Sequence, residues 1–244
     1  SSFTTVDESS EVKGFNTDVV QPLSMVNNFS GLIDSIYVPP DPTLAAGPYD
    51  LVQAVNTKVA ISSKTDGSGT SWDLTSWFSN VGTSGLQLFD PWVIYDQYSA
   101  RFFLLVAGLN TSTQQSYLFL SVSTQSDVSQ STWCNYRINS KQFYGSTGLW
   151  ADYPKVGVNP WGIFITANMF EFNSNNFRWP SLWIFNKSQL NSCVSSGSLQ
   201  KWVFNDLKNP DGTTAFTVQP ALTLGNNHSE FMVNALPSGS NKLT

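Results

Sequence analysis

Residues 90–106 read DPWVIYDQYSARFFLLV, two short apolar runs joined by a polar turn. The first run starts at Pro91 and is rich in β-branched and aromatic residues, and the second runs from Phe102 to Val106. Such runs, bounded by turn residues and too short for a helix of several turns, are typical of β-strands. This stretch therefore predicts an antiparallel hairpin whose first strand begins at a proline, where a missing backbone N–H is tolerated.

The same proline-led hairpin recurs along the chain. Four units share it, and their proline-to-proline steps are 49, 63 and 66 residues. They begin at Asp41-Pro42, Asp90-Pro91, Asp152-Tyr153-Pro154 and Gln219-Pro220. Repeats of this length made of short antiparallel strands favour an all-β protein, a β-propeller of four-stranded antiparallel blades. A β-sandwich is the alternative, although it gives no reason for the repeated start.

Further strands follow two of these hairpins. We expect them at 117–122 and 133–138 in the second unit, and at 181–185 and 202–204 in the third. Helices are predicted only as short turns, near residues 74–78 and 187–190.

The domain expected from these units is a propeller over residues 39–244, with blades starting near 41, 90, 152 and 219. The fourth unit has room for a single hairpin, so we expect the propeller to be incomplete in the chain shown. Residues 1–38 are then an N-terminal extension, or a closing strand that completes a small ring. Neighbouring chains covering the open faces are a further alternative.

Composition excludes several partners. Charged residues make up 12% of the chain, the net charge is −5, and no basic cluster occurs, so we expect no nucleic-acid partner. No apolar run is long enough for a membrane span. Ser, Thr and Asn account for 75 of 244 residues, which favours a secreted, extracellular or cell-surface protein with a weakly charged polar surface.

Cys134 and Cys193 are the two cysteines, and in an extracellular chain they predict one disulfide. Two buried, unpaired thiols are the alternative. Acceptor sequences for N-glycosylation lie at Asn28, Asn110, Asn186 and Asn227. Their number is close to the roughly 4.6 triplets of this kind that chance placement gives, so they permit glycosylation without indicating it.

Several of these segments resemble a family of secreted, largely uncharacterised β-propeller proteins that occur beside sialidase-like and adhesion domains. The matching stretches are residues 39–48, 51–56, 90–96, 121–123, 152–154 and 166–170. The resemblance implies a propeller architecture and an extracellular setting, and it brings no established reaction. A sialidase site is not expected, because Arg101, Arg137 and Arg178 do not lie in matching motifs.

Catalytic chemistry has few candidates. The single histidine, His228, has no Gly-x-Ser-x-Gly partner motif, and one histidine with two separated cysteines does not make a zinc site. No cofactor or metal is predicted. Asp41, Asp90 and Asp152 would ring one mouth of the propeller channel, which makes them the candidates for the carboxyl pair of a glycoside hydrolase. The alternative is structural, with each aspartate accepting backbone N–H groups at its turn.

Nine tryptophans favour ligand binding by stacking, because sugar rings pack well on exposed indoles. The predicted ligand contacts are Trp150, Tyr153, Trp161 and Asn168, around the third hairpin. The function we expect is an extracellular, non-catalytic propeller that provides a glycan-binding or self-assembly surface. The alternative is a carbohydrate-active enzyme, a glycoside hydrolase that uses the three aspartates.

Overall fold

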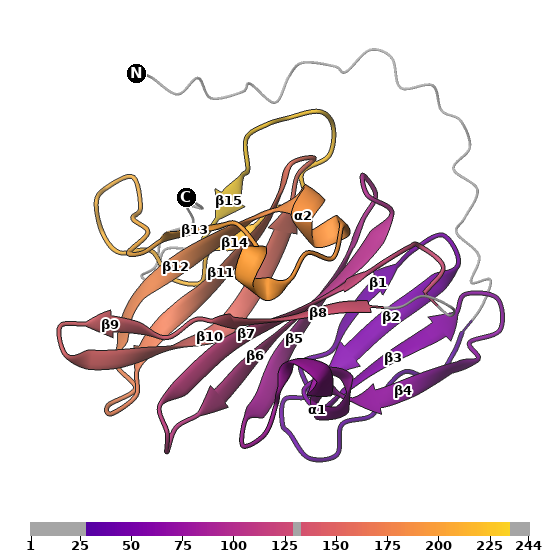
Figure 1. The fold of residues 1–244 in the computed structure, drawn as a ribbon, viewed down its shortest axis with the longest axis horizontal. Helices are drawn as coiled ribbons and strands as arrows, with labels where there is room; N and C mark the ends of the chain where they lie inside the picture. The colour runs from indigo at the N-terminus through magenta and orange to yellow at the C-terminus, as the bar shows by residue number, and fades with distance from the viewer. Residues whose placement is uncertain (1–27, 129–132, 235–244) are drawn as a thin grey trace, which may run out of the picture.

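The computed structural model describes residues 28–128 and 133–234. It is an all-β structure with four antiparallel sheets that follow one another along the chain (Figure 1). This confirms the predicted fold class at the level of secondary structure. Residues 28–38, the described part of the predicted N-terminal segment, contain no strand, and residues 1–27 lie outside the described residues.

The first two sheets have four strands each, in sequence order. The first sheet contains β1 (Thr43–Ala46), β2 (Asp50–Val55), β3 (Lys58–Ser63) and β4 (Gly69–Asp73). The second contains β5 (Gln87–Asp96), β6 (Arg101–Asn110), β7 (Gln115–Ser123) and β8 (Trp133–Asn139). The hairpin predicted from residues 90–106 is thus β5 and β6, and the further strands predicted for this unit are β7 and β8.

The third sheet has five strands and the fourth has two. The third contains β9 (Gln142–Tyr144), β10 (Thr147–Val158), β11 (Gly162–Glu171), β12 (Phe177–Asn186) and β13 (Lys201–Phe204), with β9 on the far side of β10. The fourth pairs β14 (Gln219–Pro220) with β15 (Met232–Val233). The sequence did not predict β9, because three residues are too few to show an alternating pattern.

Helical structure is limited to single turns, as predicted. The α-helices are α1 (Leu74–Trp77) and α2 (Lys187–Asn191), and the 3₁₀ turns are η1 (Ser79–Val81) and η2 (Ser196–Ser198). Asn186 caps α2, since its side-chain oxygen accepts hydrogen bonds from the backbone N–H groups of Ser188 and Gln189.

The core consists of two layers, one on each face of the second sheet. On β6, Phe102 and Leu104 pack with the first sheet, whereas Phe103 and Leu105 pack with the third. Side chains alternate between the two faces of a strand, so both faces of β6 are buried. This explains why residues 102–106 are continuously apolar instead of alternating with polar residues. In Figure 1 the second sheet accordingly lies between the first, at the right, and the third, at the left.

One long strand or early strand from each sheet lies next to one from the following sheet. β1 packs against β5, β5 against β10, and β10 against β14. Pro42 directly precedes β1, but Pro91 and Pro154 lie inside β5 and β10, so the prediction that these strands begin at their prolines is wrong. The proline-containing stretches of the three sheets converge on one region of the molecule.

Candidate functional site

A cavity of about 170 Å³ lies where β1, β5 and β10 converge. We call it the Asp–Lys pocket, and its lining residues are Asp41, Pro42, Asp90, Pro91, Trp92, Tyr153, Pro154 and Lys155. Asp41, Asp90 and Tyr153, three of the residues predicted from sequence, are brought together here. Asp152 does not line the pocket, yet its charge acts on the Asp90 carboxyl.

A backbone irregularity shapes the pocket. Asp41, Asp90 and Tyr153 have φ angles of 49°, 50° and 51°, in the left-handed region, and each precedes a proline. In β5 and β10 the strand register shifts at these residues, which indicates β-bulges. Bulges re-aim side chains, and non-glycine residues in this conformation tend to occur at functional sites.

The same conformation also precedes the fourth sheet, where Thr217 has a φ of 52°. It lies two residues before Gln219, the first paired residue of β14. By this criterion Tyr153 and Thr217 correspond to Asp41 and Asp90. The units predicted to begin at Asp152 and Gln219 are therefore displaced by one and by two residues.

Asparagine side chains hold these bulges in place. Asn56 donates from Nδ2 to the Asp41 carboxylate (2.6 Å) and accepts at Oδ1 from the Asp90 backbone N–H (2.7 Å). Asn168 makes a matching pair of hydrogen bonds to Thr217, accepting from its N–H (2.9 Å) and donating to its hydroxyl (2.9 Å). Asn168, predicted as a ligand contact, is thus buried in a contact between β11 and the segment that precedes β14.

Lys155 is the polar side chain that the sequence analysis missed. It is only 6% exposed, and its Nζ lies 3.4 Å from the centroid of the Tyr153 ring and 3.8 Å from that of the Trp92 ring. No oxygen of the described residues accepts a hydrogen bond from this ammonium. Burial lowers the pKa of Lys155 to about 8, although the charges of Asp90 and Asp41 act in the opposite direction.

The pKa values of two carboxyl groups, those of Asp90 and Asp152, are also raised above the ordinary value. Burial raises the pKa of Asp90 to about 6, and the negative charges of Asp152 and Asp41 add to this effect, whereas Lys155 opposes it. Burial also raises the pKa of Asp152. The pocket therefore combines hydrogen-bond acceptors, a carboxyl that titrates near physiological pH, and an ammonium donor with aromatic walls.

The other predicted ligand contacts lie elsewhere. Trp150 packs against Phe170 and Phe89, with ring centroids 5.6 and 6.4 Å away. Trp161, in the turn between β10 and β11, is 55% exposed and stacks on His228 with centroids 4.6 Å apart. Trp161, His228 and Trp202 line a separate cavity of about 300 Å³.

The predicted disulfide is confirmed. Cys134 on β8 is bonded to Cys193, which follows α2, with the two Cα atoms 5.7 Å apart. The bond joins the second sheet to the third. It is consistent with an oxidising, extracellular compartment.

The predicted glycosylation acceptors differ in how their side chains are used. Asn28 and Asn227 are exposed. Asn110 donates to the carbonyl of Gly85 (2.7 Å), and Asn186 caps α2. Glycosylation at these four residues stays a prediction.

Comparison with family models, curated proteins and solved structures finds no match. Among residues 28–128 and 133–234, no helix is long and apolar enough to cross a membrane. In the same residues, no group of three or more His, Cys, Asp and Glu side chains is placed to hold a metal ion.

Proposed function

We propose that this protein is an extracellular, non-catalytic β-propeller that binds a glycan in the Asp–Lys pocket. The observation that carries the binding function is Lys155, a buried residue that lines a cavity with Asp41 and Asp90 and whose ammonium has no hydrogen-bond acceptor among the described residues. Buried polar groups are normally hydrogen-bonded, and a ligand oxygen would supply the missing acceptor.

The propeller architecture is supported by the order and packing of the sheets. Each sheet follows the previous one in sequence, and the first strands pack in the same order, β1 on β5, β5 on β10 and β10 on β14. A sandwich has one core between two sheets, whereas this chain has two core layers among three consecutive sheets. An experimental structure with the sheets stacked in parallel layers, and not arranged radially around an axis, would contradict this part of the proposal.

A glycan fits the chemistry of the pocket because each sugar hydroxyl both donates and accepts hydrogen bonds. Carboxylates of Asp41 and Asp90 accept, and Lys155 donates. Tyr153, which lines the pocket, is 44% exposed, and a partly exposed aromatic side chain can stack on a sugar ring. The cavity of about 170 Å³ is smaller than the roughly 300–1,000 Å³ of a drug-sized ligand site, so it accepts one end or one edge of a chain.

Calorimetric titration with a panel of oligosaccharides tests the binding function. The Lys155→Met variant keeps the apolar stem and removes the donor, so we expect its affinity to fall about tenfold or more. The matched control is Lys201→Met, which removes an exposed ammonium from β13 and should leave the affinity unchanged. Equal affinity of the Lys155→Met variant and the unaltered protein would refute binding at this pocket.

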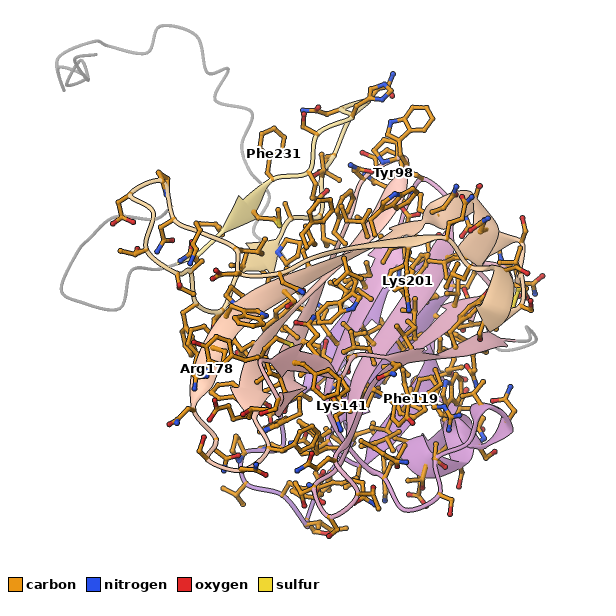
Figure 2. All side chains as sticks on the ribbon, turned by 60° about the vertical axis from the view of Figure 1, so that its left-hand side comes forward. Tyr98, Phe119, Lys141, Arg178, Lys201 and Phe231 are labelled. Carbon is orange, nitrogen blue, oxygen red and sulfur yellow. A yellow bond between two sulfur atoms is a disulfide. The ribbon has the colours of Figure 1, made fainter. Side chains whose placement is uncertain are left out.

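Self-association is the second part of the proposal, and the surface we assign to it is the fourth sheet. Met232 on β15 is exposed, as are Leu224 and Phe231 in the segment that connects β14 to β15, and Figure 2 shows Phe231 projecting away from the strands. Exposed apolar groups that gather on one face mark association sites. Sedimentation of the unaltered protein should show a second copy bound, and Phe231→Ser should shift the equilibrium to monomers. A particle that is monomeric at all concentrations would contradict it.

A glycoside hydrolase is the alternative function, and one observation favours it. Asp90, with its pKa raised to about 6, has the character of a general acid, and the carboxylate of Asp41 lines the same cavity. If the protein is an enzyme, the bound oligosaccharide is cleaved, and Asp90→Asn abolishes cleavage while binding persists. If the oligosaccharide is recovered intact after prolonged incubation, the non-catalytic function is supported.

A further inference from the structure

We propose that the Asp–Lys pocket selects an amino sugar, a glycan unit that carries a primary ammonium group beside a hydroxyl. This inference rests on the proposed glycan binding and names the class of sugar. It comes from the arrangement of Asp41, Asp90 and Lys155 around one small cavity, with the charge of Asp152 acting on Asp90 from outside its lining.

The first argument is charge. Three carboxyl groups act on this cavity or line it, and a single ammonium, that of Lys155, opposes them. Lys155 forms no ion pair with any described residue and instead faces the rings of Trp92 and Tyr153. The carboxylates therefore retain negative charge that no neighbouring cation neutralises. A ligand ammonium would supply the positive charge that balances it, in a partly buried site where charge-assisted hydrogen bonds are strongest.

The second argument is the unmatched donor. Lys155 is more than nine-tenths buried, lines the cavity and lacks an acceptor, so the ligand must present an oxygen next to its cation. A 2-amino-2-deoxy sugar has an ammonium and a hydroxyl on adjacent carbons. The ammonium would bind between the Asp90 and Asp41 carboxylates, and the hydroxyl would accept from Lys155 Nζ.

The third argument is size. A cavity of about 170 Å³ has room for roughly half a dozen groups of the size of a water molecule, so it admits one edge of a sugar ring. An acetylated amine is larger and neutral, and it brings an amide N–H in place of an ammonium. The pocket should therefore discriminate between the free amine and its acetylated form.

Three β-1,4-linked glucose tetramers that differ only at C2 provide the test, with a hydroxyl, an acetamido group or an amine at that carbon. Calorimetric titration near neutral pH at about 0.15 M salt limits non-specific attraction to an acidic protein. We expect the amine tetramer to bind about tenfold more tightly than the hydroxyl tetramer. Asp90→Asn should remove most of this preference, because it should weaken binding of the amine tetramer about tenfold more than binding of the hydroxyl tetramer.

The matched control is Asp66→Asn, which removes an exposed carboxylate in the turn between β3 and β4. It removes one negative charge, as Asp90→Asn does, and should keep the full preference for the amine. An equal loss of preference in both variants would show a general charge effect and overturn the inference.

The remaining outcomes separate this inference from the proposed function. If the hydroxyl and amine tetramers bind equally well and Lys155→Met weakens both, glycan binding stands and amine selection is wrong. If none of the tetramers binds, both are overturned. A lysine-containing peptide that binds more tightly than the amine tetramer, and loses affinity in Asp90→Asn, would reassign the pocket to peptides and overturn the amino-sugar inference.

Discussion

The ammonium of Lys187 lies 2.9 Å from the carboxylate of Asp96, and these side chains are 4% and 0% exposed. Lys187 begins α2 beside the third sheet, whereas Asp96 ends β5 of the second. Lys187 also donates to the carbonyl of Asn159 (2.6 Å), and Asp96 accepts from the backbone N–H groups of Tyr98 and Ser99. The pair is thus hydrogen-bonded on both sides and connects two sheets.

Lys187→Met should lower the free energy of unfolding by about 3 kcal/mol, because it leaves the Asp96 carboxylate buried without its cation. Chemical denaturation measures this loss. The double variant Lys187→Met with Asp96→Asn should lose less than the two single variants together, since neither charge then remains unpaired. A loss within about 0.5 kcal/mol for Lys187→Met, as for an ordinary surface substitution, would show that the pair is dispensable.

Removing the disulfide should destabilise the protein, because it increases the conformational entropy of the unfolded chain. Cys134 and Cys193 are 59 residues apart, and opening a loop of this length costs about 4 kcal/mol in the chain-entropy model. The double variant Cys134→Ser with Cys193→Ser and the reduced unaltered protein should have the same lowered unfolding midpoint in denaturant. A midpoint that reductant does not change would contradict a stabilising role.

Asp90→Asn should stabilise the protein at neutral and alkaline pH. The pKa of Asp90 is raised from 3.8 to about 6, so the folded protein binds a proton more tightly than the unfolded chain does. Stability from this group is therefore fully present below about pH 4 and is lost as the pH rises through about 6. Asn carries no charge and tolerates the positive φ of 50° at this position.

Thermal melts of both proteins across this range provide the measurement. The melting temperature of Asp90→Asn relative to the unaltered protein should rise between about pH 4 and 7 and then level off. Asp41, Asp152 and Lys155 are present in both proteins, so their common effects cancel to a first approximation. A difference that is independent of pH would mean that Asp90 is not desolvated.

Gly157→Ala should release the fourth sheet from β10. A methyl group there would lie 2.4 Å from the carbonyl oxygen of Ala221 and 2.6 Å from Pro220 Cβ, closer than atoms can approach. The hydrogen bond from Val158 N–H to the Ala221 carbonyl (3.0 Å) would have to break or shift. Limited proteolysis should then cleave faster within residues 217–234. Gly197→Ala, where the added carbon meets nothing within 4 Å, is the control and should leave the rate unchanged.

Much of the strand structure was predictable because it depends on local patterns. The hairpin of β5 and β6 was predicted from its apolar runs and turn residues, and the turns α1 and α2 from the lack of longer helical periodicity. The start of the third unit was displaced, because Asp152 was aligned with Asp90 by residue type. The position of the bulge depends instead on the proline, and the residue directly before Pro154 is Tyr153.

The site was predicted only in part. Asp41 and Asp90, two of the three aspartates expected at one channel mouth, line one cavity, whereas Asp152 does not line it. Lys155 was missed because a lysine in a strand is ordinarily exposed, and its burial depends on Trp92 from a different sheet. Sequence patterns report which residues lie on one face of a strand. The contact between Trp92 and Lys155, which are 63 residues apart in the sequence, depends instead on how two sheets pack together.

The left-handed residue that recurs in or just before β1, β5, β10 and β14 is Asp, Asp, Tyr and then Thr, while its φ stays between 49° and 52°. Backbone shape is thus retained where side-chain identity varies. A scaffold of this kind can exchange the functional groups at its centre without altering how the strands pair. Redesigning ligand preference in this molecule should accordingly begin at Asp41, Asp90 and Tyr153, which line the Asp–Lys pocket and lie outside the hydrophobic layers.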